Sequence, residues 1–183
     1  MAYDISDDTR AELSDYLAMV APGRILECGS GPGSTPILAR YARRAGASVS
    51  SLEHSPEYLS ATATALHERR LDAYVDLLYA PLYQEPLFGL PWYGWKLDGV
   101  YDFILVDGPP EITSGRYAAL YHLLPHLMHG GEIWLDDANR PIEQAALADW
   151  AEDLPISITY ENTDRGLARI KRTPARGEGS YSN

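Results

Sequence analysis

The residues with the clearest chemical potential lie in the segment ILECGSGPGSTP, which begins at Ile25. An acidic residue, Glu27, stands before three glycines, Gly29, Gly31 and Gly33. Glycine lets the backbone turn sharply and approach a ligand with no Cβ in the way. The spacing differs from the dinucleotide motif G-x-G-x-x-G, because position 34 is serine. The segment therefore predicts a ligand-binding loop, and Glu27 suits a ligand with a cationic amino-acid end.

A second acidic residue, Glu53, ends the next apolar run. It follows the glycine-rich loop at close to the spacing of about 20 residues at which an acidic side chain binds ribose hydroxyls in nucleotide-binding βαβ units. A carboxylate can accept hydrogen bonds from both hydroxyls of a ribose. Taken alone, Glu53 is more typical of a solvated acid at the start of a loop. Together with the glycine-rich loop, it predicts a ribose-binding residue.

Three more carboxylates stand at two later strand ends: Asp107, and the neighbours Asp136 and Asp137. Adjacent strands lie about 4.8 Å apart, so these side chains can converge. Like charges this close repel unless a cation joins them, and oxygen ligands suit Mg²⁺, Ca²⁺ or Mn²⁺. In the structural alternative, Asp107 caps a strand and Asp136 or Asp137 pairs with Arg116 or Arg140. Both interpretations stay open at this point.

Apolar runs typical of β-strands alternate with helical segments along the chain. The expected strands are residues 24–28, 47–53, 74–80, 101–107, 131–137, 156–160 and 166–172. Helix starts are indicated at Ser6, at Ser34 or Thr35 before Pro36, at Ser55 before Pro56, at Ser114 and at Pro141. The helix from Ser114 is expected to end at Gly130 and Gly131. This alternation predicts a parallel sheet with helices on both faces, whose ligands bind beyond the carboxyl ends of the strands.

The segments ILECGSGPG, YDFILVDGPP and GGEIWLDD, with Glu53 between the first two, resemble the class I S-adenosylmethionine-dependent methyltransferases. The resemblance covers roughly residues 20–172. It implies an α/β, Rossmann-like doubly wound sheet of seven strands in the order 3-2-1-4-5-7-6, with the last strand antiparallel. It also implies methyl transfer from S-adenosylmethionine to a small hydroxylated acceptor.

The resemblance assigns the methionine part of S-adenosylmethionine to the first segment. The residues implied there are Glu27, Gly29, Ser30, Gly31 and Gly33. The glycine-rich loop would thus lie along the amino-acid end of the cofactor.

The nucleoside part is assigned to residues further along the chain. The resemblance implies that Glu53 holds the ribose and that His54 borders the adenine. Pro81 and Leu82 would lie against the adenine ring, and Asp107 would face the region where the methyl donor and the acceptor meet.

The carboxylates resemble the metal ligands of catechol-type and macrolide-sugar O-methyltransferases. That likeness implies a Mg²⁺ or other divalent cation on Asp107, Asp136 and Asp137, which would lower the pKa of the acceptor hydroxyl. The sequence Gly-Pro-Pro after Asp107 departs from the catechol-type pattern. If no metal is bound, His54, Asp107 or Asp136 is the candidate base.

Residues 81–99 are rich in proline, glycine and aromatic side chains and are expected to form a long loop. Its aromatic residues are Tyr83, Phe88, Trp92, Tyr93 and Trp95. They would either cover the acceptor pocket as a lid or pack onto the edge of the sheet as extra core.

The composition limits the class of protein. The chain has 183 residues and a formal net charge of −11, which disfavours binding to nucleic acid. Its single cysteine, Cys28, excludes an internal disulfide and is expected to be a buried thiol. No secretory signal and no apolar stretch of the ~20 residues that span a membrane is visible. We therefore expect a cytoplasmic protein with one domain at residues 1–172 and a disordered tail at 173–183.

Two other functions remain open at the level of sequence. One is an NAD(P)-dependent oxidoreductase of the Rossmann type, against which the serine at position 34 argues. The other is a module that binds S-adenosylmethionine without catalysing transfer. The expected partner is a small-molecule acceptor, with neither nucleic acid nor a membrane, and the sequence leaves open whether the chain forms a homo-oligomer.

Overall fold

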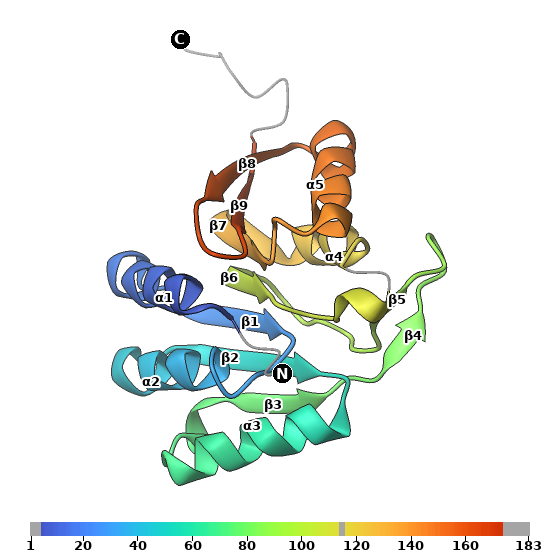
Figure 1. Cartoon of the computed structure of the whole chain (residues 1–183). Coiled ribbons are helices and arrows are strands. Elements are labelled where there is room, and N and C mark those ends of the chain that lie inside the picture. The colour runs from blue at the N-terminus through green and yellow to red at the C-terminus, as the bar shows by residue number, and fades with distance from the viewer. Residues whose placement is uncertain (1–4, 114–115, 174–183) are drawn as a thin grey trace.

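A seven-stranded sheet forms the centre of the computed structural model, which describes residues 5–113 and 116–173 (Figure 1). Its strands are β1 (Arg24–Cys28), β2 (Ser48–Glu53), β3 (Asp76–Tyr79), β6 (Tyr101–Val106), β7 (Leu127–Asp136), β8 (Ile156–Glu161) and β9 (Leu167–Arg172). They lie in the order β3-β2-β1-β6-β7-β9-β8. Strand β9 runs antiparallel to both of its neighbours. The predicted α/β fold, strand order and antiparallel last strand are therefore confirmed.

The helices begin close to the residues that the sequence indicates. They are α1 (Asp7–Val20), α2 (Thr35–Ala45), α3 (Pro56–Glu68), α4 (Ala119–Leu123) and α5 (Pro141–Asp153), with short 3₁₀ turns at Asp72–Tyr74, Glu111–Thr113 and Leu124–His126. The hydroxyl of Ser6 accepts a hydrogen bond from the Thr9 N–H at 3.1 Å, which caps α1. Within the described ranges, no helix is long and apolar enough to cross a membrane.

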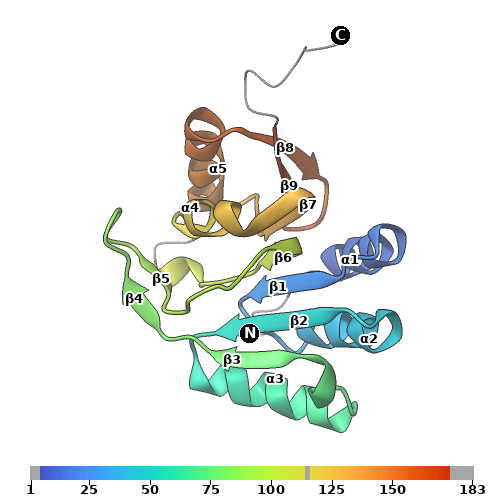
Figure 2. The same cartoon turned by 180° about the vertical axis from the view of Figure 1, so that it is seen from behind.

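Both faces of the sheet are covered, because successive strand residues point to opposite sides and both kinds are apolar. Ile25 packs with residues of α1 and α2, whereas its neighbour Leu26 packs with residues of α4 and α5. Figure 1 and the reverse view in Figure 2 show these two helical layers on either side of the sheet. Because β1, β2, β6 and β7 run parallel, their carboxyl ends all lie at one edge of the sheet, between the two helical layers.

Residues 81–99, predicted as a loop, contain a short antiparallel hairpin of β4 (Leu82–Gln84) and β5 (Pro91–Tyr93). The prediction was wrong on this point because three-residue strands give too little alternation to be recognised. The hairpin lies beside α4 (Figure 2). There the Trp92 ring stacks on the His122 ring, with 5.9 Å between the ring centroids. Trp92 and Tyr93 are buried, whereas Tyr83, Phe88 and Trp95 are partly exposed. The segment thus supplies core with some of its aromatic residues and surface with the others.

The segment between β6 and β7 also differs from expectation. Ser114 lies outside the described residues, α4 has only five residues, and β7 already begins at Leu127. Gly130 and Gly131 therefore lie inside a strand rather than after a helix. At the other end of the chain, Thr173 donates its N–H to the Pro155 carbonyl at 2.8 Å, so it belongs to the folded part. The rest of the predicted tail, 174–183, lies outside the described residues.

Candidate active site

A cavity of about 230 Å³ opens at the carboxyl ends of β1, β2, β6 and β7, where ligands bind in this class of sheet. Its wall is formed by Gly29, Ser30, Glu53, His54, Ser55, Tyr58, Tyr93, Asp107, Gly108, Pro110, Arg116, Asp137, Arg140 and Arg165. The topology explains this gathering, since β1 lies between β2 and β6 in the sheet. The ends of three neighbouring strands thus supply the glycine-rich loop, Glu53 and Asp107 to one space.

Gly29 is the glycine whose lack of a side chain the structure requires most clearly. Its φ is +96°, and a Cβ at this position would lie 2.6 Å from the backbone nitrogen of Gly108. The loops after β1 and β6 approach each other here, and Asp107 N donates to the Cys28 carbonyl at 2.9 Å. Gly29 therefore allows two strand ends to meet and leaves the cavity between them open.

Glu27 lies below the loop and does not line the cavity. Its Oε2 accepts hydrogen bonds from the hydroxyls of Thr35 at 2.6 Å and Ser51 at 2.5 Å, and its side chain is fully buried. Thr35 Oγ1 in turn accepts from Gly31 N at 3.0 Å. Burial raises the pKa of Glu27 to about 7. In this arrangement Glu27 holds the loop from beneath, through Thr35 and Gly31, and the contact with the methionine part that the resemblance implies stays a prediction.

Glu53 and His54 form the side of the cavity at the end of β2. Glu53 is nearly buried, and its Oε1 accepts a hydrogen bond from Ser55 N at 2.7 Å and lies 3.0 Å from His54 Nδ1. Ser55 begins α3 by accepting a hydrogen bond from Tyr58 N through its hydroxyl. These bonds fix the Glu53 carboxylate at the carboxyl end of β2, where the sequence predicts a ribose-binding acid.

Several residues predicted for the cofactor lie outside this wall. Of that set, the structure brings Gly29, Ser30, Glu53, His54 and Asp107 together at the cavity. Gly31, Gly33, Pro81 and Leu82 are not among the described residues that line it. Gly31 instead contacts the start of α2, where its carbonyl accepts a hydrogen bond from Thr35 N at 3.2 Å.

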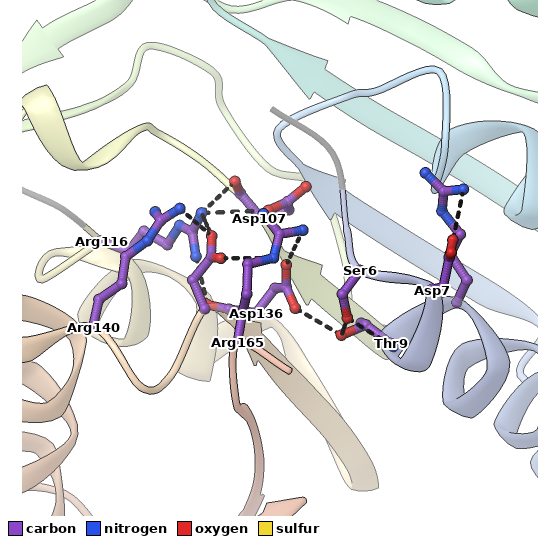
Figure 3. Close-up of polar contacts among 10 residues, drawn as sticks. Ser6, Asp7, Thr9, Asp107, Arg116, Asp136, Arg140 and Arg165 are labelled. Atoms are coloured by element: carbon purple, nitrogen blue, oxygen red, sulfur yellow. Dashed lines mark hydrogen bonds and ion pairs between the residues drawn. The ribbon is translucent and has the colours of Figure 1, made fainter. Parts of the chain in front are cut away.

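Three arginines surround the carboxylates that the sequence places at the ends of β6 and β7 (Figure 3). Arg116 Nη2 lies 3.3 Å from Asp107 Oδ1 and 3.0 Å from Asp137 Oδ2. Arg140 Nη2 also lies 3.0 Å from Asp137 Oδ2. Arg165 lies on the other side, 3.4 Å from Asp137 Oδ1. The group is therefore an ion-pair network in which each of these carboxylate contacts is made by a guanidinium.

Asp136 has a different position from the other two carboxylates. It is fully buried and absent from the cavity wall, and its Oδ1 accepts a hydrogen bond from the Thr9 hydroxyl at 3.0 Å. It therefore cannot reach a ligand in the cavity as the side chains stand. In the structure Asp136 ties α1 to the end of β7, a contact that gives it a structural role and no place in the cavity wall.

The donor set does not fit a divalent cation in this arrangement. Oxygen atoms of Asp107, Asp136 and Asp137 do lie within 4.8 Å of one another, a spacing that a metal could join. The Arg116 guanidinium, however, contacts Asp107 and Asp137 at once and occupies the space between them. A cation there would displace a buried positive charge and face those of Arg140 and Arg165. The alternative in which the carboxylates pair with arginine describes the observed contacts.

Asp107 combines a place in the cavity wall with an unusual environment. Burial raises its pKa well above the ordinary value, the Arg116 charge lowers it, and the charges of Asp136 and Asp137 raise it again. A carboxylate with a raised pKa holds a proton more strongly than an exposed one and so is a better base near neutral pH. Its side chain remains 13% exposed, toward the cavity.

The candidate site residues and their predicted arginine partners leave out six residues of the wall: Ser55, Tyr58, Tyr93, Gly108, Pro110 and Arg165. Arg165 lies between β8 and β9. Because β9 is antiparallel, that connection returns to the carboxyl edge, so the predicted strand order itself was a usable signal. Tyr93 was recognised only as one aromatic residue among five. Its position depends on a hairpin that has no sequence signature, and no signal distinguishes it from Trp92.

The family model described as a methyltransferase domain matches residues 26–138, which is more than half of the chain and includes the glycine-rich loop, Glu53 and the strand ends at Asp107 and Asp136. The chain therefore belongs to this family of methyltransferase domains. No curated protein sequence shows significant similarity to it.

Solved structures share the fold at low sequence identity. The S-adenosylhomocysteine (SAH)-bound methyltransferase PaMTH1 of Podospora anserina aligns with a TM-score of 0.74 and 20% identity over 92% of this chain and 80% of its own. An O-methyltransferase of Bacillus cereus in complex with SAH gives 0.70 and 18%, over 94% and 84%. TomG of Streptomyces achromogenes, an O-methyltransferase in complex with S-adenosylmethionine, gives 0.66 and 17%, over 93% and 82%. These likenesses establish a common fold.

Proposed function

We propose that the protein transfers a methyl group from S-adenosylmethionine to a hydroxyl group of a small acceptor. The observation that carries the proposal is the meeting of Gly29, Glu53 and Asp107 in one cavity, at three neighbouring strand ends of a methyltransferase domain. The solved structures of similar fold that hold S-adenosylmethionine or SAH support the choice of cofactor. Those described as O-methyltransferases support the choice of a hydroxyl.

The wall of the cavity fits such a cofactor chemically. The Glu53 carboxylate can accept hydrogen bonds from a ribose diol, and the Gly29 backbone leaves room that a Cβ would fill. His54 and Tyr58 offer flat surfaces beside Glu53 for a purine ring. S-Adenosylmethionine supplies an electrophilic methyl group on a sulfonium sulfur. The chain's task is to position that group against the acceptor and to exclude water.

Asp107 is the residue that we assign to proton transfer. Its carboxylate takes the proton of the acceptor hydroxyl as the oxygen forms its bond to the methyl carbon. The carbon–sulfur bond breaks in the same step, and its electron pair leaves with the sulfur as SAH. Arg116 holds Asp107 in place, through the 3.3 Å ion pair and through a 2.6 Å hydrogen bond from Nη2 to the Asp107 backbone carbonyl.

The proposed transfer needs no divalent cation. The support is the ion-pair network of Arg116, Arg140 and Arg165, which places positive charge beside Asp107 and Asp137, and beside Asp136 through Arg165 Nη2 at 3.9 Å. Arg140 and Arg165 are partly exposed and line the cavity together with Asp107. We expect the acceptor to bind between these arginines and the cofactor.

Isothermal titration calorimetry of the unmodified protein with S-adenosylmethionine and SAH tests the proposal. We expect both to bind, and we expect NADH not to bind. A panel of small hydroxylated molecules, analysed by mass spectrometry for a gain of one methyl group, then tests transfer. Binding of NADH alone would overturn the assignment in favour of an oxidoreductase. Tight binding of S-adenosylmethionine without turnover on the panel would instead favour a non-catalytic binding module.

A further inference from the structure

The hydroxyl of Tyr93 is a buried polar group to which the proposed chemistry gives no role. The residue is 3% exposed and lines the cavity, yet its Oη has no hydrogen-bond partner among the described residues. Leaving a buried hydroxyl unpaired is destabilising, because the group loses its hydrogen bonds to water and gains none in return. Buried polar groups are nearly always paired in folded proteins. An unpaired hydroxyl in a cavity wall therefore indicates a partner that enters the cavity.

The hairpin holds this hydroxyl at a defined place. Tyr93 ends β5, pairs with Leu82 of β4, and accepts a hydrogen bond from Trp95 N at 2.9 Å through its carbonyl. Its ring meets the His54 ring edge-on, with 6.1 Å between centroids, and the Trp92 ring at 5.3 Å. A ring packed on two sides cannot turn its hydroxyl out to solvent. Tyr93 therefore keeps Oη buried beside Gly108, in the wall of the cavity.

The hydroxyl lies where the ends of β1 and β6 meet. A Cβ on Gly108 would collide with Tyr93 Oη and would lie 3.0 Å from Gly29 Cα. Burial raises the pKa of Tyr93 well above its ordinary value, so the group is a hydrogen-bond donor at neutral pH. The Tyr93 ring also contacts the ring of His54, the residue that follows Glu53. Tyr93 Oη thus belongs to the part of the cavity shared by Gly29 and Glu53.

We propose that Tyr93 is a cofactor-binding residue whose hydroxyl donates a hydrogen bond to the S-adenosyl ligand. The inference rests on the proposed function, because it assigns the Gly29 and Glu53 side of the cavity to that ligand. It also gives the β4–β5 hairpin a purpose. Through Tyr93, the hairpin forms part of the cavity wall and brings one polar group to it.

Replacing Tyr93 with phenylalanine removes the hydroxyl and keeps the ring. We expect Tyr93→Phe to weaken SAH binding by about 3- to 10-fold, the effect of one neutral hydrogen bond. Without ligand, its melting temperature should equal or exceed that of the unmodified protein, because an unpaired buried group is gone. Tyr83→Phe is the matched control, since Tyr83 lies on the partner strand of the same hairpin and is 41% exposed. That variant should bind SAH normally.

Calorimetry with SAH and thermal melting of the free proteins separate the outcomes. Unchanged SAH affinity in Tyr93→Phe would overturn the inference and leave the proposed function standing. A lowered melting temperature of the free Tyr93→Phe variant, with the same loss of affinity in Tyr83→Phe, would also overturn it, since the hydroxyl would then serve the hairpin. Failure of the unmodified protein to bind SAH would overturn the proposed function itself.

Discussion

The Arg116 guanidinium contacts two oxygen atoms of Asp107 at once. Its Nη2 donates to the Asp107 backbone carbonyl at 2.6 Å and lies 3.3 Å from the side-chain Oδ1. Nη1 of the same guanidinium donates to the Asp136 backbone carbonyl at 2.5 Å. One buried side chain therefore joins the ends of β6 and β7 and orients the carboxylate that faces the cavity. The same geometry stabilises the sheet edge and places the candidate base.

Glu53 should control cofactor affinity more than stability. We expect Glu53→Ala to weaken SAH binding by about 10- to 150-fold, the range for hydrogen bonds that involve a charged group. Calorimetry with SAH measures the effect. Glu57→Ala is the control, because Glu57 is an exposed acid in the first turn of α3. This variant should bind SAH normally. Equal affinities in the two variants would mean that the ribose is held elsewhere.

Gly29 should tolerate no side chain. In Gly29→Ala, the added Cβ would lie 2.6 Å from Gly108 N and 2.9 Å from the Asp107 carbonyl carbon, so the two loops must separate. We expect a loss of SAH binding and a clear fall in the free energy of unfolding, measured by urea denaturation. Gly46→Ala shares the positive φ but has nothing within 4 Å of the added Cβ, and should lose only about 1 kcal/mol. Similar losses in both variants would contradict the steric explanation.

The main features of the fold could be predicted from the sequence, because they depend on patterns that repeat along the chain. Apolar runs that end in Glu53 or Asp107 gave the parallel strands, and the strand order followed from the resemblance. The fine placement of side chains could not be predicted in the same way. Whether Asp137 faces a metal or an arginine depends on where Arg116 and Arg165 end in space, which is a property of packing between distant segments.

The glycine-rich loop illustrates the same limit. Its ligand-binding character was readable from the spacing of Gly29 and Gly31, but the depth of Glu27 was not. Glu27 is one residue before Cys28 in a strand buried on both faces, so its side chain points into the interior toward Ser51. The alternation that buries it is visible only once both faces of the sheet are known to be covered.

Glu27 should make stability depend on pH in a particular direction. Its folded-state pKa of about 7 lies above the ordinary value of 4.5, so the folded chain keeps a proton that the unfolded chain releases. The resulting stabilisation is complete below about pH 4.5, falls as the pH rises, and is lost above about pH 7. We expect the unmodified protein to lose about 3 kcal/mol relative to Glu27→Gln across this range. Urea denaturation of both proteins at a series of pH values measures this difference, and parallel curves would contradict it.

Asp107 should set the pH dependence of the reaction. The proposed proton transfer needs its carboxylate form, and burial raises its pKa. The value of kcat/KM should therefore fall as the pH is lowered through a pKa well above the ordinary value of about 4 for aspartate. Asp107→Asn should lose about 10²- to 10⁴-fold in kcat while it still binds SAH. An unchanged kcat in Asp107→Asn, with any acceptor found on the panel, would remove Asp107 from the chemistry.

Asp137 distinguishes the ion-pair network from a metal site by the sign of one measurement. Three guanidiniums approach its carboxylate, so Asp137→Asn leaves Arg116 buried with less opposing charge. Breaking a buried pair from one side costs about 3–5 kcal/mol, so we expect a lower free energy of unfolding without metal. If the carboxylates instead formed a cation site, the same substitution would relieve their repulsion and raise the free energy of unfolding without metal. Urea denaturation in EDTA and then in Mg²⁺ measures both effects. We expect Mg²⁺ to leave the unmodified protein unchanged, whereas stabilisation by Mg²⁺ would restore the metal site.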